Sequence, residues 1–175
     1  NFTDAHLARA DITGADLTDA CFHNADLSRA KLNGAILRRT DLKDSDLSEA
    51  DINLADLTGA NLVGAKLSGA NLDRIKLNQA KLNGAQLSGA RMTKAKLTQV
   101  DLTGADLSGA NLTGAELNEA ILEGADLSRA NLTEAILISA NLKNTFLIGA
   151  NLQKANLEGV NLEGADLAGT KLRNA

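Results

Sequence analysis

The chain has 175 residues, a formal net charge of −4, no Trp, Tyr or Pro, and a single Cys. One cysteine excludes an internal disulfide, and the absence of a long apolar run predicts no membrane-spanning segment within these residues. The mild acidity is unfavourable for general nucleic-acid binding. Only three residues are aromatic, all Phe, which is too few for the aromatic platforms of saccharide-processing proteins.

The whole sequence repeats one five-residue unit, Ala-(Asp/Asn)-Leu-(Ser/Thr)-Gly, which is clearest from Val100 to Glu119. Positions whose numbers end in 2 or 7 are Leu in 30 of 35 cases, and those ending in 0 or 5 are Ala in 28 of 35. Five residues of helix advance about 500°, so this Leu pattern leaves no apolar stripe on a helix. The period therefore excludes an amphipathic helix.

In an extended chain, the Ala and Leu of one unit share a face, and the Asp or Asn between them points the other way. The next Ala comes three residues after the Leu, so the chain must turn there. All 15 Gly stand two residues after a Leu-type position, from Gly14 to Gly169, as expected for a turn position with positive φ. Each unit is thus predicted to be a three-residue strand and a corner, repeated into a solenoid with a Leu and Ala interior.

Spacing alone allows four sides with 20 residues per coil, or three sides with 15. Phe2 and Phe22 lie 20 residues apart, and Ile12, Ile52 and Met92 differ by multiples of 40. Unusual interior residues would then stack on the same side of a four-sided coil, which favours four. The sequence predicts an all-β fold, a quadrilateral parallel β-helix of about nine coils that forms one domain over residues 1–175.

On these residues the sequence resembles the pentapeptide-repeat family, whose motif is A(D/N)LXX, and the resemblance covers the whole chain. It implies a right-handed quadrilateral β-helix. The Leu-rich centres look more like cyanobacterial members than like topoisomerase-protecting members, which use Phe more often. The implied function is a non-enzymatic structural or protein–protein interaction scaffold. It could be the soluble domain of a membrane-anchored protein that helps to form the heterocyst glycolipid or envelope layer.

The alternative function implied by the family is a DNA mimic that binds a type II topoisomerase such as gyrase. Mimicry of DNA should need a dense acidic stripe. Here residues that would stack at intervals of 20 mix signs, as in the series Asp41, Asn61, Lys81 and Asp101. The charge pattern therefore favours the scaffold.

In chain order, Phe2 and Phe22 come first, and they are expected to stack in adjacent coils. With no capping segment in sight, they are the candidate end contact for a homodimer or an end-to-end assembly. The repeat is already in phase at Asn1, so the domain is expected to have been excised from a longer chain. Cys21 and His23 flank Phe22 on the outside, but two or three loosely placed ligands do not predict a metal site.

Further along, Arg38 and Arg39 are expected on a solvated corner. Outward positions then become apolar between residues 121 and 148, and these five form a candidate interaction patch for a protein partner: Ile121, Ile136, Ile138, Phe146 and Ile148. On a four-sided rod, Ile136 and Ile138 would lie opposite Phe146 and Ile148. Apolar groups gathered on a surface are typical of contact sites.

The Asp or Asn before each Leu is expected to hydrogen-bond the backbone of the corner, and Asn111, Asn131 and Asn151 to form an amide ladder. A filled convex rod offers no pocket, so we expect no enzyme activity, no catalytic residue and no cofactor. The partner is not identified by the sequence. A cytoplasmic or membrane-tethered location is expected rather than secretion.

Overall fold

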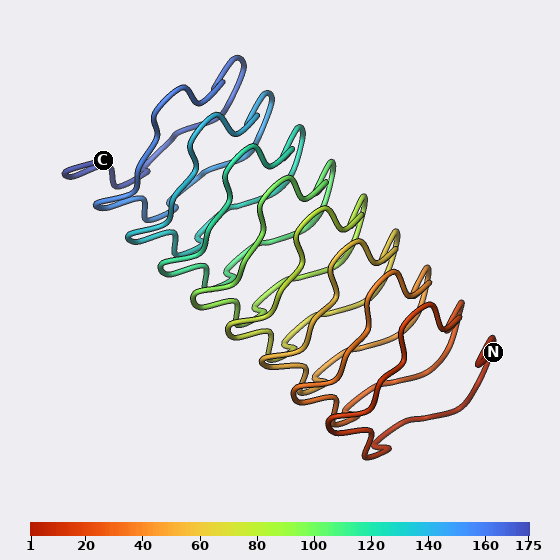
Figure 1. The fold of residues 1–175 in the computed structure, drawn as a ribbon. Helices are drawn as coiled ribbons and strands as arrows, with labels where there is room; N and C mark the ends of the chain where they lie inside the picture. Colours follow the sequence, from red (N-terminus) through yellow and green to blue (C-terminus); the bar gives the residue numbers. More distant parts are fainter.

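The computed structural model describes all residues from Asn1 to Ala175, which wind into one elongated spiral (Figure 1). Successive coils lie side by side along the axis, and the two termini are at opposite ends. The chain forms no helix, so none is present that could cross a lipid bilayer.

Parallel β-bridges join each coil to the next. Every residue whose number ends in 1 or 6 pairs with the residue 20 positions later, from His6 with Asp26 to Asn151 with Lys171. One coil therefore takes 20 residues, which is four repeat units. This register agrees with the spacing of Phe2 and Phe22.

The strands are shorter than the three residues predicted, because each is a single bridging residue. Its neighbours belong to turns. In each unit the N–H at the Ala position donates to the C=O of the Leu position three residues earlier, as Ala105 does to Leu102 at 3.0 Å. The turn thus uses four of the five residues, and only the Asp or Asn position lies outside it.

The third residue of every turn, whose number ends in 4 or 9, has a positive φ. The values run from 52° to 61° for the 20 non-glycine residues and from 63° to 69° for the 15 Gly. With the hydrogen bond across it, this makes each corner a type II turn. The prediction drawn from the glycine positions is confirmed, although Leu54, with φ at 59°, occupies the same strained position.

The interior is one continuous core of 51 buried hydrophobic residues, nearly all Leu and Ala. Three Ala positions instead hold buried hydroxyl groups, those of Thr40, Ser45 and Thr145. Each hydroxyl donates to a backbone carbonyl, at 2.6, 2.6 and 3.0 Å respectively. These polar groups are therefore satisfied without interrupting the core.

The N-terminal end carries the stacked aromatic pair. The rings of Phe2 and Phe22 are 4.7 Å apart between centroids and within 7° of parallel. Phe22 is 1% exposed and Phe2 is 38% exposed, so one face of the stack is open to solvent.

Candidate interaction surface

The Asp and Asn residues that precede each Leu position support the turns. At every such residue except Asp51, the side-chain oxygen accepts the N–H of the residue two positions later. Asp106, for example, accepts the N–H of Ser108 at 2.9 Å. Their predicted role as turn supports is thereby confirmed, and it leaves them no need of a ligand.

The predicted amide ladder is wrong. The Oδ1 of Asn131 accepts both the N–H and the hydroxyl of Thr133, and its Nδ2 donates to the Thr113 hydroxyl at 3.0 Å. No hydrogen bond joins Asn131 to Asn111 or Asn151. The local turn uses the amide oxygen that a ladder between coils would need.

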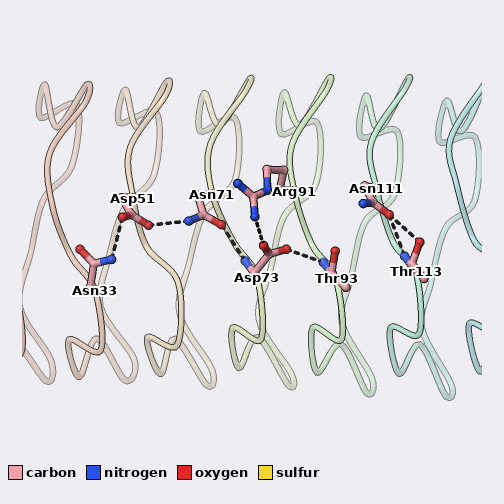
Figure 2. A network of polar contacts seen from close by, with 8 residues as sticks. All are labelled: Asn33, Asp51, Asn71, Asp73, Arg91, Thr93, Asn111 and Thr113. Atoms are coloured by element: carbon pink, nitrogen blue, oxygen red, sulfur yellow. Dashed lines mark hydrogen bonds and ion pairs between the residues drawn. The ribbon is translucent and has the colours of Figure 1, made fainter.

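Polar contacts do link coils along one side (Figure 2). Asp51 accepts from the Nδ2 of Asn33 at 2.7 Å and from the Nδ2 of Asn71 at 2.8 Å. These contacts join three successive coils through one carboxylate. They explain why Asp51 is the one residue of its type that does not accept the N–H of its own turn.

Further along the same side, Asp73 replaces a missing turn support. Arg91 stands where Asp or Asn is usual, and it cannot accept the Thr93 N–H. Asp73 in the preceding coil accepts that N–H at 2.9 Å and also pairs with the Arg91 guanidinium (Figure 2). Asn78 serves Thr98 in the same way, at 3.0 Å.

Asp56 is the one buried carboxylate, 7% exposed. Partial burial acts to raise its pKa, but hydrogen bonds from Thr58 and Arg38 outweigh burial and lower the pKa to about 2. Arg38 lies 2.8 Å away and the Lys76 ammonium 3.6 Å away. The neighbouring Arg39 pairs with Asp19 at 2.6 Å, so both arginines of the predicted solvated corner have acidic partners.

The five residues of the predicted patch differ in exposure. Ile121, Phe146 and Ile148 are 41%, 49% and 43% exposed, whereas Ile136 and Ile138 are half-buried. Ile136 and Phe146 lie in different columns, because Ile136 bridges Glu116 and Asn156 while Phe146 bridges Asp126 and Asp166. The patch is therefore spread over separate sides of the rod.

Leu54 was not among the residues predicted for the patch, although it is the most exposed large apolar side chain, at 58%. Its number ends in 4, which places it at a corner where Gly or a charged residue is usual, and that signal could have identified it. Ile36 is also exposed, at 37%.

The cysteine and histidines near the N-terminus do not gather into a site. The Cys21 sulfur lies 3.3 Å from the Thr3 hydroxyl. No three His, Cys, Asp or Glu side chains are placed to hold a metal ion.

Two open depressions mark the surface. One, of about 480 Å³, is lined by Ser108, Gly109, Ser128, Arg129 and Ile148. The other, of about 570 Å³, is lined by Arg38, Arg39, Thr58, Gly59 and Gln79. Both lie over corners of the coil, outside the packed core.

Repeated turns, parallel bridges and a filled interior define a solenoid protein, and comparison with solved structures makes it a right-handed β-helix. The family model for pentapeptide repeats matches in eight overlapping copies, the first over residues 1–34 and the last over 140–175. The chain belongs to the pentapeptide-repeat family.

Three solved structures illustrate the likeness. HetL, a pentapeptide repeat protein involved in heterocyst differentiation regulation in the cyanobacterium Nostoc, is 40% identical over 97% of this chain and 81% of its own, with a TM-score of 0.50. QnrB1, a plasmid-mediated fluoroquinolone resistance protein, is 24% identical over 97% and 87%, with a TM-score of 0.76. The Nostoc protein alr5209 is 33% identical over 47% and 84%, with a TM-score of 0.44. Among curated proteins none matches the chain.

Proposed function

We propose that this chain is a non-enzymatic scaffold that binds another protein through its outer surface. The observation that carries the proposal is the contrast between interior and exterior. The core is filled by apolar side chains, while large apolar groups such as Phe146, Ile148 and Ile121 are held outside, more than 40% exposed. Rigid display of such groups suits a contact surface better than it suits catalysis.

The scaffold that we propose is a four-sided rod of about nine coils, forming a single domain. The 20-residue register and the four turns in each coil support this shape. With neighbouring coils about 4.8 Å apart, the rod is roughly 40 Å long. Because its coils are rigidly spaced, residues 20 apart present partners with a fixed repeat.

The similarity to HetL supports a role among cyanobacterial pentapeptide-repeat proteins. A further role in a membrane-anchored glycolipid or envelope layer stays a prediction from family resemblance alone. It requires flanking segments that would tether the rod, and no contact in the structure bears on it.

The scaffold is tested by capture of partners from a cyanobacterial lysate, with the wild type and the Ile136→Asp, Phe146→Asp double variant as bait. Both positions point outward, so the variant should melt within about 2 °C of the wild type. We expect the double variant to lose specifically captured proteins. Identical sets of captured proteins would reject the patch as the contact surface.

The alternative, a DNA mimic that binds gyrase, has weaker support. At 24% identity, the likeness to QnrB1 concerns the fold alone. Within one bridged column, Asp41, Asn61, Lys81 and Asp101 follow one another, so a cation interrupts the acidic spacing that mimicry needs. We expect no inhibition of gyrase supercoiling at micromolar protein, and strong inhibition would favour the mimic instead.

We also propose the exposed face of Phe2 as a contact for a second copy of the chain. Its ring is stacked on Phe22 and therefore held rigid, which lowers the entropic cost of burying it. Sedimentation of the wild type and a Phe2→Ser variant tests this contact. A monomeric wild type at 100 μM, or a dimer that persists in the variant, would contradict it.

A further inference from the structure

Phe146 stands in a column of acidic residues. It bridges Asp126 in the preceding coil and Asp166 in the following coil, and Asp126 in turn bridges Asp106. Successive residues of the column are separated by the spacing of parallel chains, about 4.8 Å. An exposed aromatic ring is thus flanked by a carboxylate on either side, with a third one coil away.

These three carboxylates are free to bind a cation. In each, Oδ1 accepts a turn N–H, from Ser108, Ser128 and Ala168 at 2.9, 2.8 and 3.0 Å, and Oδ2 accepts no hydrogen bond. None of the three takes part in any of the nine ion pairs of the molecule. The column therefore carries unneutralised negative charge.

Beside the column lies the depression of about 480 Å³ described above. Its floor is low because Ser108, Gly109 and Ser128 are small, and Ile148 closes one end. Arg129, also exposed, lies at the corner rather than in the acidic column. A side chain seated here would meet apolar atoms of Ile148 and lie next to the acidic column.

Ile36 shows why this arrangement differs from the rest of the surface. It too lies between two aspartates in its column, Asp16 and Asp56. There, however, Arg38 and Lys76 already pair with Asp56. The coil around Ile36 therefore supplies its own cations, whereas the column around Phe146 does not.

We propose that the face formed by Asp106, Asp126, Phe146, Ile148 and Asp166 binds a polypeptide segment in which a large apolar side chain lies between two Lys or Arg residues. This rests on the proposed scaffold function and names the chemistry of its partner. In an extended segment, residues two apart are about 6.8 Å apart and share a face. An apolar group over Phe146 would thus bring both cations within reach of Asp126 and Asp166, where complementary charge favours binding.

The probe is a capped nonapeptide with Lys-Ser-Leu-Ser-Lys at its centre, titrated into the full chain and followed by amide NMR shifts at low salt. We expect shifts concentrated at residues 126–129, 146–149 and 166–168, and at least a fivefold loss of affinity in 300 mM salt. Peptides with Glu in place of both Lys, or Gly in place of Leu, should bind at least tenfold more weakly. Equal binding of the Glu peptide, or shifts centred elsewhere, would overturn the proposal.

The decisive variant is D106N/D126N/D166N. Asn keeps the Oδ1 that accepts the turn N–H and removes only the charge, so the coil should stay folded. The matched control is D26N/D41N/D46N, which makes the same change in net charge at aspartates that are also outside ion pairs. We expect at least a tenfold loss for the first and less than a twofold change for the second. Equal losses in both would mean non-specific attraction and would contradict the site.

Two outcomes separate this inference from the scaffold function. If a partner is captured through the Ile136 side and the probe does not bind the Phe146 face, the scaffold stands and the inference fails. If the chain instead self-associates through this face, and Phe146→Ser abolishes the self-association, the occupant is a second copy and the proposed basic segment is wrong.

Discussion

At the scale of single residues, Asp56 shows how charge contributes to this fold. Most ion pairs on the rod join exposed side chains, such as Arg39 with Asp19, whose side chains are about 60% exposed, and such pairs add little stability. Asp56 is instead buried and receives hydrogen bonds from Thr58 and Arg38. Its ionised form is therefore favoured in the folded state.

We predict that Asp56 contributes stability that is lost in acid. Its pKa is lowered from 3.8 to about 2 on folding, so the contribution is complete above about pH 4 and disappears as the pH falls toward 2. The size is on the order of 2 kcal/mol. Urea unfolding of wild type and Asp56→Asn between pH 7 and pH 2 should show curves that converge in acid. A constant difference over this range would contradict the assignment.

Leu54 combines a positive φ with a side chain that is 58% exposed. Since the left-handed conformation costs a non-glycine residue roughly 1 kcal/mol, Leu54→Gly is predicted to stabilise the protein by up to about 1 kcal/mol. The matched control is Val63→Gly, at the turn position before, where φ is not positive. That change should destabilise by about 0.5 kcal/mol or more. Denaturant unfolding of both variants checks the opposite signs.

At the scale of the repeat unit, the sequence allowed the inward and outward positions to be predicted because a solenoid repeats one solution. Apolar and charged residues never exchange places between the Leu position and the outside, so the burial of Leu107 or Ala105 could be derived from spacing alone. Strand length could not. It depends on which carbonyl each Ala N–H selects, and the turn bond to the preceding Leu takes the residues that a longer strand would need.

The same competition explains the ladder that does not form at Asn131. Spacing places three amides in one column, but it does not decide whether their oxygens bind the next coil or their own turn. The replacement of the turn support at Thr93 by Asp73 was equally hidden, because it depends on a residue 20 positions earlier.

The core prediction is tested at Leu107, which is fully buried. Leu107→Ala should cost about 2–5 kcal/mol through loss of apolar contacts and the cavity left behind. Leu107→Asp should cost more, because the charge would be buried without a partner. The outward control is Asp106→Asn, with an expected change within about 0.5 kcal/mol. Thermal melting followed by far-UV circular dichroism checks the order, and an unchanged melt in Leu107→Asp would contradict the packed interior.

At the scale of the whole molecule, each coil contacts only its neighbours, so the rod behaves as a one-dimensional stack. This makes columns of residues 20 apart the functional units of the surface. The neighbours of Phe146 in its column follow from the sequence once the 20-residue coil is known. The free charge of Asp126 and Asp166 does not, because it depends on where the surrounding Lys and Arg side chains settle.

Amide hydrogen exchange measured residue by residue tests the repeated coil most directly. Leu67 and Leu87 donate their N–H groups to Gln86 and Asp106 in the next coil, both at 2.6 Å. The following N–H groups, of Ser68 and Ser88, have no acceptor because Lys66 and Gln86 replace the usual Asp or Asn. We predict that the Leu amides exchange at least about a thousandfold more slowly than the adjacent Ser amides. Equal protection within each pair, or protection without a five-residue period, would contradict the coil.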